Sequence, residues 1–250
     1  FYKLKPKNII AVTGTNGKTS VADLFYQILS INNISVASIG TLGIKFDGKT
    51  IKTNLTSPDT LSLHKNLQML KKKKIDNVII ESSSHGLDQK RLHHIKFKGA
   101  VFTNFSQDHL DYHKNMKSYL NAKLILFREI LKRKSTVISD KKIGPFFLLK
   151  KIANKKNLRI LDISKELKKI KIKKLGFKDN FKMKNLAMAI KAAKLAGLRE
   201  NVIYKSLKKI RDVSGRLELV QKYSNGTRVF IDYAHTPDAL SKTLESLRSN

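Results

Sequence analysis

An octapeptide near the N-terminus, Thr13-Gly14-Thr15-Asn16-Gly17-Lys18-Thr19-Ser20, has the residue types that bind the phosphates of a nucleotide. It lies between an apolar run and a stretch with helical spacing, so its backbone N–H groups and a helix N-terminus would face an anion. Lys18 would contact the β- and γ-phosphates, and the Thr19 hydroxyl would hold Mg²⁺. The strict Walker pattern requires glycine where Val12 stands, so this is a shorter Gly-x-x-Gly-Lys-Thr variant. We predict nucleotide binding at Gly14–Ser20; the alternative is an ordinary glycine-rich turn.

Acidic and histidine side chains follow two later apolar runs. Glu81 ends the run at 77–81, where an unpaired buried carboxylate would be costly and needs a cation or several donors. Asp108, His109 and Asp111 follow the run at 99–103. In a parallel sheet the carboxyl ends of neighbouring strands share one edge, where ligands bind. Oxygen and nitrogen donors at such an edge suit a hard divalent ion. We expect these groups to lie close to the phosphate-binding segment Gly14–Ser20, the phosphate loop.

Short apolar runs alternate along the chain with stretches whose apolar residues have helical spacing. These two patterns predict the strands and helices that position the residues above. Strands are expected at 8–13, 35–39, 77–80, 99–103, 136–139 and 158–161, and helices at 19–31, 61–70, 116–131, 181–195 and 202–210. The Lys- and Ile-rich segment 141–174 gives weaker signals, with alternation around 170–175. Several strands are continuously apolar, which is typical of strands buried on both faces. We predict an α/β fold with a mostly parallel sheet and helices on both faces.

A second unit is expected to begin near residue 213. The segment 212–216 has linker composition, 217–221 and 228–232 are expected strands joined by the turn Ser224-Asn225-Gly226, and 236–247 is an expected helix. We therefore assign residues 1–212 and 213–250 to two domains. The chain lacks an initiator Met and its last residues, LESLRSN, have the pattern of an interrupted helix, so we expect a fragment of a longer protein.

The composition excludes several classes of function. With 51 Lys+Arg and 19 Asp+Glu the formal net charge is +32, which alone would permit nucleic-acid binding. The lysines are scattered over nearly every segment and Trp is absent, so we interpret the excess as a solvated surface, as in a protein from an A/T-rich genome. The absence of Cys excludes a disulfide framework, a thiolate zinc site and a cysteine nucleophile. No apolar run approaches the roughly 20 residues of a membrane span.

Five motifs in order resemble the Mur ligases, ATP-dependent enzymes that join an amino acid to the growing cell-wall peptide. They are TGTNGKTS at 13–20, ESSSHGLDQKR at 81–91, FTNFSQDHLDYH at 102–113 followed by Lys123 in NAKLILF, SGRLE at 214–218 and DYAHTPDAL at 232–240. The branch that adds the third amino acid, meso-diaminopimelate or lysine, is the most similar. The resemblance implies a central ATP-binding domain at 1–212 and the start of a C-terminal domain at 213–250, with the N-terminal UDP-binding domain absent.

The resemblance also implies a mechanism and roles for individual residues. In the family a substrate carboxylate attacks the γ-phosphate of ATP, and an amine displaces phosphate from the acyl phosphate, which releases ADP and phosphate. Gly14–Ser20 would hold ATP, Thr19 and Glu81 one Mg²⁺, and His109 a second. Lys123 corresponds to the lysine that the family carbamylates with CO₂ to support that metal. The implied catalytic residues are thus Lys18, Glu81, His109 and Lys123.

Further residues match the family's substrate and nucleoside contacts. The implied contacts to the UDP-linked substrate are Thr56, Ser57, Ser83, Gln89 and Arg91, and those to adenine and ribose are Asn185, Arg216 and Asp232. Lys182 stands where the family usually has Asn. The implied partners are a UDP-muramoyl dipeptide, a diamino acid and ATP, for a cytoplasmic monomer without nucleic-acid or membrane partners.

Two alternatives stay open. Folylpolyglutamate synthases share the loop and fold, but normally have Gly-Lys-Gly-Ser where this chain has Gly17-Lys18-Thr19-Ser20. A basic nucleic-acid-binding ATPase would show clustered Arg with aromatic residues on a strand face.

Overall fold

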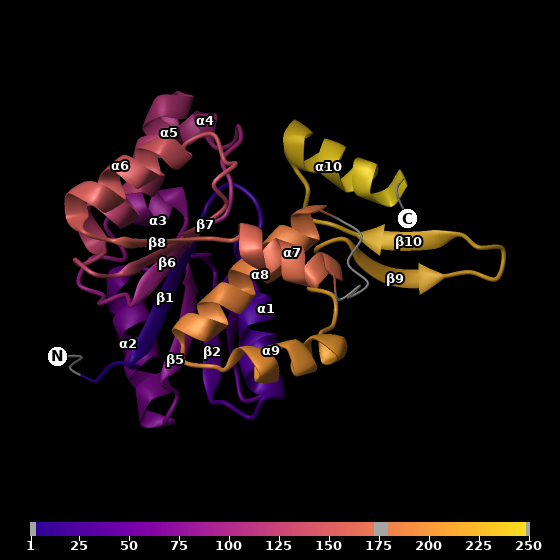
Figure 1. Ribbon diagram of the computed structural model, residues 1–250, viewed down its shortest axis with the longest axis horizontal. Helices are drawn as coiled ribbons and strands as arrows, with labels where there is room; N and C mark the ends of the chain where they lie inside the picture. The colour runs from indigo at the N-terminus through magenta and orange to yellow at the C-terminus, as the bar shows by residue number, and fades with distance from the viewer. Residues whose placement is uncertain (1–3, 173–179, 249–250) are drawn as a thin grey trace.

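The computed structural model describes residues 4–172 and 180–248, and a mostly parallel sheet is at its centre (Figure 1). The strand order is β4-β3-β2-β5-β1-β6-β7-β8. The strands are β1 (Asn8–Thr13), β2 (Val36–Gly40), β3 (Gly43–Phe46), β4 (Lys49–Ile51), β5 (Asn77–Glu81), β6 (Gly99–Phe102), β7 (Thr136–Ser139) and β8 (Arg159–Asp162). All neighbours from β2 to β8 pair in parallel, and β3 and β4 add an antiparallel edge. The predicted fold class is confirmed.

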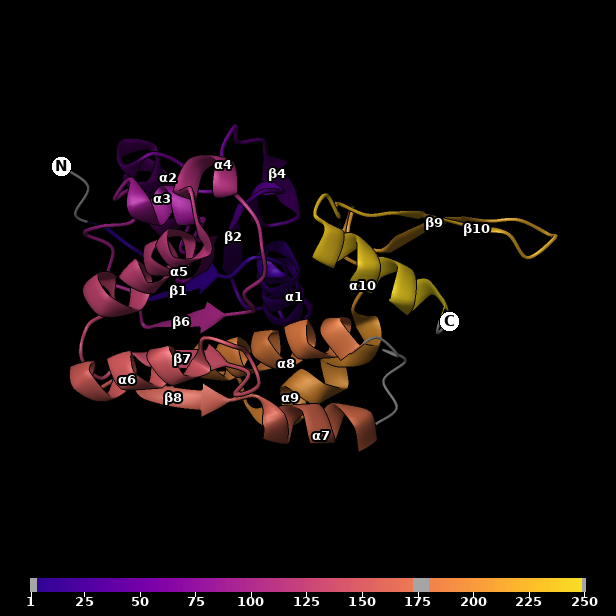
Figure 2. The ribbon, with the colours of Figure 1, turned by 90° about the horizontal axis from the view of Figure 1, so that it is seen from above.

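Helices cover both faces of this sheet (Figure 2). They are α1 (Lys18–Ile31), α2 (Thr60–Lys72), α3 (Ser84–Asp88), α4 (Leu110–His113), α5 (Met116–Ile125), α6 (Phe146–Lys156), α7 (Ser164–Ile172), α8 (Asn180–Leu195) and α9 (Glu200–Ser206), with a π-helical turn at Leu126–Ile130 and a 3₁₀ turn at Leu207–Lys209. One core cluster joins α1, α7, α8 and α9 to the sheet, and a second joins α2, α3, α5 and α6 to the opposite face. Within the described ranges, no helix is long and apolar enough to cross a membrane.

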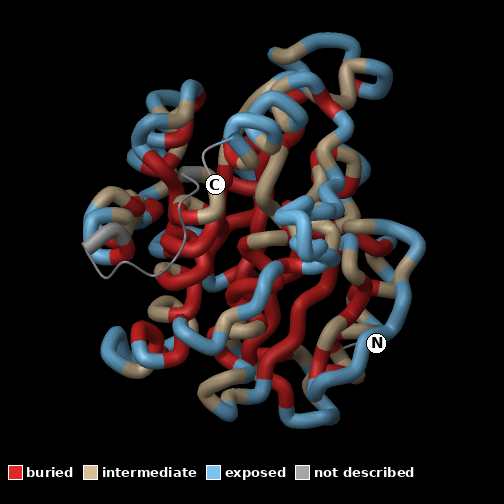
Figure 3. The backbone as a smooth tube through the Cα atoms, turned by 90° about the vertical axis from the view of Figure 1, so that its right-hand side faces the viewer, coloured by how far each residue is buried: buried red, intermediate tan, exposed pale blue. Residues whose placement is uncertain are grey.

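The central strand β1 explains why the strands are continuously apolar. Ile10 and Val12 belong to the cluster on the α1 face, whereas Ile9 and Ala11 belong to the cluster on the α2 face. All four are almost fully buried, because successive side chains of a strand point to opposite sides and both sides are covered. Figure 3 shows the strands as a buried centre surrounded by exposed loops.

The structure corrects several expected elements. The helix expected over 116–131 is α-helical only to Ile125 and ends in the π-helical turn. The alternation around 170–175 is wrong as far as Ile172, which is helical; residues 173–175 lie outside the described residues. The apolar positions Ile163, Leu167 and Ile170 have helical spacing and pack on the α8 cluster, but lysines between them hide this pattern. The elements β3, β4 and α6 were not predicted.

The C-terminal segment 213–248 (the C-terminal unit) extends from the body in both ribbon views. It contains the antiparallel pair β9 (Glu218–Lys222) and β10 (Arg228–Ile231) and the helix α10 (Pro237–Arg248). The predicted hairpin, its turn and the following helix are confirmed.

The buried carboxylate of Glu166 joins α7 to α8 and α9. It accepts hydrogen bonds from Lys194 Nζ at 2.8 Å and Tyr204 Oη at 3.0 Å, and Lys191 Nζ lies 3.2 Å away. Burial alone would raise the pKa of Glu166, but the two lysines outweigh it and hold the pKa below its ordinary value. The ionised form of Glu166 therefore stabilises the packing of these helices.

Replacing Glu166 with Gln is expected to lower the free energy of unfolding by about 2 kcal/mol at pH 7. Because the folded pKa is depressed, this contribution is present above the unfolded pKa of about 4.3 and is lost as the pH falls through the folded pKa. Thermal unfolding at pH 7 and pH 3.5 measures the difference, which should shrink at the lower pH. Glu129→Gln, at a side chain that is 56% exposed, is the control and should change stability little. A difference that does not depend on pH would contradict the prediction.

Candidate active site

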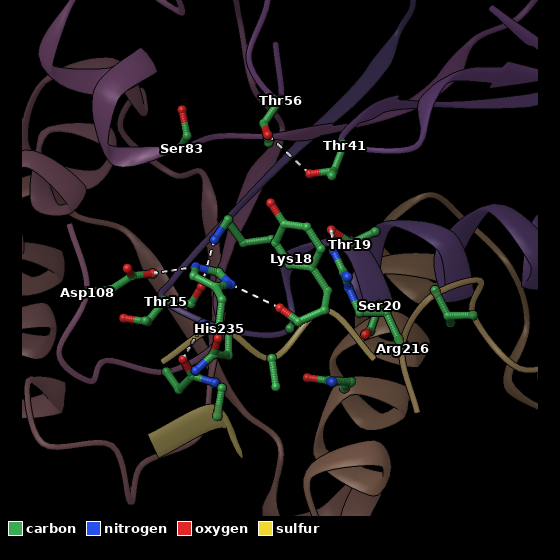
Figure 4. Close-up of a pocket in the computed structure, with 18 of the residues that line it drawn as sticks. Thr15, Lys18, Thr19, Ser20, Thr41, Thr56, Ser83, Asp108, Arg216 and His235 are labelled. Carbon is green, nitrogen blue, oxygen red and sulfur yellow. Dashed lines mark hydrogen bonds and ion pairs between the residues drawn. The ribbon is translucent and has the colours of Figure 1, made fainter. Parts of the chain in front are cut away.

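A pocket of about 410 Å³ opens at the carboxyl edge of the parallel strands (Figure 4). Its walls come from the phosphate loop, the loop before α2, the segments after β5 and β6, the first turns of α8 and the C-terminal unit. The predicted site residues that line it are Thr15, Asn16, Gly17, Lys18, Thr19, Ser20, Thr56, Ser57, Ser83, Arg91, His109, Lys123, Asn185, Arg216 and Asp232. Gly14, Glu81 and Gln89 are not among the residues that line it.

The segment after β6 holds the phosphate loop through two hydrogen bonds of Asn104. The Asn104 carbonyl accepts from Thr15 N at 3.1 Å, and Asn104 Oδ1 accepts from Asn16 N at 2.8 Å. Gly17 has φ +85°, and α1 begins directly after it. The Lys18 ammonium donates to the Gly14 and Thr15 carbonyls at 3.0 and 2.7 Å. An anion in the loop would thus meet the positive end of α1 and a lysine already held beside it.

Glu81 ends β5 next to the first turn of α1. Its Oε2 accepts from Thr19 Oγ1 at 2.9 Å and its Oε1 accepts from Thr41 N at 3.0 Å. Burial raises the pKa of Glu81, and nearby Lys18 opposes this rise. A carboxylate and a hydroxyl side by side fit a hard cation. Among the residues that the structure describes, no three His, Asp or Glu side chains gather as a metal site, so further ligands would have to be phosphate oxygens and water.

Lys123 lies on α5 beneath the phosphate loop and is only 1% exposed. Its Nζ donates to the Gly14 carbonyl at 2.8 Å and lies 4.2 Å from the centre of the Tyr119 ring. Burial, and then the neighbouring Lys18 charge, lower the pKa of Lys123 well below its ordinary value, although Asp108 partly opposes them. This lysine therefore differs from the exposed lysines of the chain, because burial makes its charged form less stable.

His109 and His235 approach Asp108 from two different units. His109 Nε2 lies 3.5 Å from Asp108 Oδ2, and His235 Nε2 lies 3.9 Å from the same oxygen. The His109 ring also packs against His85, with 4.9 Å between ring centres. The C-terminal unit thus reaches the segment after β6.

Four of the five implied substrate residues, Ser57, Ser83, Gln89 and Arg91, form one hydrogen-bonded group. Ser57 Oγ donates to the Glu81 carbonyl at 2.8 Å and accepts from Ser83 N at 2.9 Å. Arg91 Nη1 donates to the Ser57 carbonyl at 2.9 Å, and Arg91 also contacts the Gln89 side chain. Gln89 therefore lies behind Arg91 instead of on the pocket wall.

The implied nucleoside residues Asn185, Arg216 and Asp232 line the same pocket. Asn185, on α8, lies so close to Gly17 that a Cβ there would be 2.6 Å from Asn185 Oδ1. Arg216 Nη2 donates to Thr19 Oγ1 at 3.2 Å, and Asp232 Oδ2 accepts from Leu217 N at 2.6 Å. Lys182 Nζ donates to the Leu217 carbonyl at 3.2 Å, so this lysine ties α8 to the C-terminal unit.

Thr41, Asn104 and Tyr119 also belong to the site, although they were not predicted as site residues. Thr41 binds Glu81, Asn104 binds the phosphate loop, and the Tyr119 hydroxyl donates to Thr15 Oγ1 at 3.3 Å. Asn104 follows the carboxyl end of β6, a position that could have marked it. Thr41 likewise follows the carboxyl end of β2, but nothing in the sequence points to its partner Glu81, 40 residues away. Tyr119 has no such signal, because its partner Thr15 is 104 residues away in the chain.

Replacing Gly17 with Ala is expected to weaken nucleotide binding at least tenfold, since a Cβ strains the left-handed backbone and collides with Asn185. Titration with a fluorescent ATP analogue measures this affinity. Gly226→Ala is the matched control, because Gly226 also has φ +85° but has open space around it. It should cost about 1 kcal/mol of stability without changing nucleotide affinity. Equal nucleotide affinity in both variants would contradict the assignment of this loop.

The parallel sheet, the loop and the pocket define a phosphate-loop α/β protein of the nucleotide-binding class. Residues 12–198 match the family described as Mur ligase middle domain, and residues 215–250 match Mur ligase, glutamate ligase domain. The chain belongs to the Mur ligase family, and membership implies the use of ATP. The resemblance inferred from the five motifs is confirmed.

The similar proteins are longer than this chain. UDP-N-acetylmuramoyl-L-alanyl-D-glutamate–2,6-diaminopimelate ligase of Rickettsia bellii is 38% identical over 274 residues, which cover 100% of this chain and 57% of that protein. The ligase of the same name from Rhizobium meliloti is 34% identical over 273 residues, or 99% of this chain and 56% of that protein. The chain therefore spans somewhat more than half the length of these curated relatives.

Solved structures show the same fold. A structure of a UDP-N-acetylmuramoyl-L-alanyl-D-glutamate–2,6-diaminopimelate ligase has a TM-score of 0.78 and 28% identity, and the match covers 98% of this chain and 54% of that one. The apo form of folylpolyglutamate synthase from L. casei has a TM-score of 0.75 at 16% identity, with coverage of 98% and 72%. The second likeness shows a shared fold alone.

Proposed function

We propose that the parent protein of this chain is the ligase that adds meso-diaminopimelate to UDP-N-acetylmuramoyl-L-alanyl-D-glutamate. The observation that supports this most is the convergence of the phosphate loop, the Glu81–Thr19 pair and the Thr56–Arg91 group on one pocket. The relatives at 34–38% identity carry this activity in their names. We assign residues 1–212 of this chain to one domain and residues 213–250 to a second. We take the parent protein to be a cytoplasmic monomer.

The proposed reaction has two steps. The γ-carboxylate of D-glutamate attacks the γ-phosphorus of ATP, a P–O bond to ADP breaks, and an acyl phosphate forms. The amine of the diamino acid then attacks the acyl carbon, the bond to phosphate breaks, and the nitrogen loses a proton. Such a reaction depends on positioning and charge neutralisation, which Lys18 and the loop N–H groups supply. Thr19 and Glu81 would hold Mg²⁺, which supplies further neutralisation of phosphate charge when bound.

We propose that Lys123 is carbamylated. The neutral amine attacks CO₂, an N–C bond forms, and a proton is lost to solvent, which leaves an anion where a cation stood. The buried position beneath Gly14 supports this, because burial favours the neutral amine that reacts. The carbamate and His109 would then share a second Mg²⁺ at the pocket wall.

The remaining assignments concern binding. We assign Asn185, Arg216 and Asp232 to adenine and ribose, since all three line the pocket and Asn185 and Arg216 lie next to Gly17 and Thr19 of the phosphate loop. We assign Thr56, Ser57, Ser83 and Arg91 to the UDP-linked substrate, with Gln89 supporting Arg91.

The test is an assay of the full-length parent with ATP, Mg²⁺, the UDP-muramoyl dipeptide and either meso-diaminopimelate or L-lysine. We expect phosphate release that depends on the dipeptide and on diaminopimelate. Release with lysine alone would correct the amino acid, and release with neither would refute the ligase. The 250-residue chain alone should be inactive, and turnover by it would contradict the domain assignment.

A further inference from the structure

The turn after β2 touches both halves of the candidate site. Gly40, the last residue of β2, packs against the Glu81 carboxylate so closely that a Cβ there would overlap it. Thr41 donates its backbone N–H to Glu81 Oε1 at 3.0 Å, and its Oγ1 lies 3.3 Å from Glu81 Oε2. The same Oγ1 lies 3.1 Å from Thr56 Oγ1, as the dashed line in Figure 4 marks. Thr41 thus bridges the carboxylate at the phosphate loop and the loop assigned to the UDP-linked substrate.

The Thr41 hydroxyl has one proton and two acceptors within reach, so two arrangements exist. In the first, Thr56 donates to Thr41 and Thr41 donates to Glu81 Oε2. In the second, Thr41 donates to Thr56, and Glu81 Oε2 keeps the hydrogen bond from Thr19 at 2.9 Å. The direction of the Thr41 proton therefore decides how many hydrogen bonds this carboxylate oxygen accepts.

An anionic substrate at Thr56 favours the second arrangement. Once Thr56 donates its proton to the substrate, it no longer donates to Thr41, and its oxygen becomes a better acceptor. The Thr41 proton then turns away from Glu81 Oε2. A lone pair of that oxygen becomes available to a cation beside Thr19.

The exposure of Thr41 indicates that its hydroxyl does not stabilise the hydrophobic core. Thr41 is exposed and its side chain faces the pocket, so its hydroxyl is not part of either core cluster. Replacing it with Val keeps the shape and the backbone N–H that binds Glu81, and removes only the hydroxyl that links Glu81 to Thr56.

We propose that Thr41 is a positioning residue that couples occupancy of the Thr56 loop to the cation affinity of the Glu81 carboxylate. The inference rests on the proposed function, because it takes Thr56 to be a substrate contact. Coupling between two binding sites is reciprocal, so the UDP-linked substrate and the cation should raise each other's affinity by the same factor. We expect about fivefold, the effect of one net hydrogen bond.

The test measures binding in the full-length parent without turnover. Free Mn²⁺ is followed by electron paramagnetic resonance in the presence of β,γ-methylene-ATP, with and without saturating UDP-muramoyl dipeptide. The dipeptide should tighten Mn²⁺ binding about fivefold in the wild type and in Thr41→Ser. It should have no effect on Mn²⁺ binding in Thr41→Val. Thr50→Val, at an exposed threonine of β4, is the control for the exchange itself and should behave like the wild type.

The outcomes separate this inference from the proposed function. If the dipeptide binds but tightens Mn²⁺ equally in Thr41→Val and in the wild type, or has no effect in the wild type, the coupling role is refuted and the ligase assignment stands. If the dipeptide does not bind to the wild type, the assignment of Thr56 and the coupling role both fail.

Discussion

Replacing Lys123 with Ala is expected to reduce turnover of the proposed ligase by roughly a hundred- to a thousandfold. The physical reason is the loss of the proposed carbamate anion beneath the phosphate loop, where the Lys123 Nζ lies 2.8 Å from the Gly14 carbonyl. Initial rates of phosphate release measure the effect. Short carboxylic acids such as acetate should restore part of the rate in Lys123→Ala, because a carboxylate can occupy the space and supply the charge of the carbamate.

Two further measurements make this prediction sharp. Lys117→Ala, at an exposed lysine of the same helix, should keep the wild-type rate. Protein equilibrated with ¹³C-bicarbonate should give a carbamate carbon signal by NMR that Lys123→Ala lacks. An unaffected rate in Lys123→Ala, or wild-type protein without that signal, would remove the carbamate from the mechanism.

Replacing Glu81 with Gln should lower turnover roughly a hundredfold or more without lowering stability. The amide keeps the shape of the side chain but has no negative charge to hold a cation beside Thr19. The pKa of Glu81 is raised by burial, so its ionised form costs folding free energy at pH 7, and the neutral amide removes that cost. Phosphate release and thermal unfolding at pH 7 measure the two effects.

The two buried glutamates should therefore respond in opposite ways. Glu166→Gln removes a charge that its lysine partners stabilise, and we expect lower stability. Glu81→Gln removes a charge that burial destabilises, and we expect equal or higher stability with lost activity. A Glu81→Gln protein that unfolds at lower temperature than the wild type, or that turns over normally, would contradict a functional role for this carboxylate.

Most of the sheet and its covering helices could be predicted from the sequence, because apolar runs and helical spacing are local signals. The prediction failed where the signal was short or diluted. β3 and β4 have only 4 and 3 residues, too few for a clear alternation. In α7 and α6, lysines separate the few apolar positions that face the core. The buried side of each helix therefore cannot be identified from the sequence and is seen only in the folded structure.

The phosphate loop and the acidic residues could be found from the sequence because each occupies one short segment at a strand end. The link from Glu81 through Thr41 to Thr56 could not, since it joins three segments by side-chain hydrogen bonds that have no local pattern. The same holds for the contact of Tyr119 with Thr15.

The sequence by itself determined the fold class, the phosphate loop, the order of the motifs and the family. The resemblance of the motifs already pointed to Lys123, but only the tertiary structure decided how this lysine differs physically from the exposed ones. The spacing of Lys123 resembles that of many lysines in this chain, and its chemistry comes from burial under the Gly14 carbonyl beside Lys18. A residue type and its neighbours in the chain do not set a pKa or a hydrogen-bond partner; the dielectric and the charges that the fold places around it do.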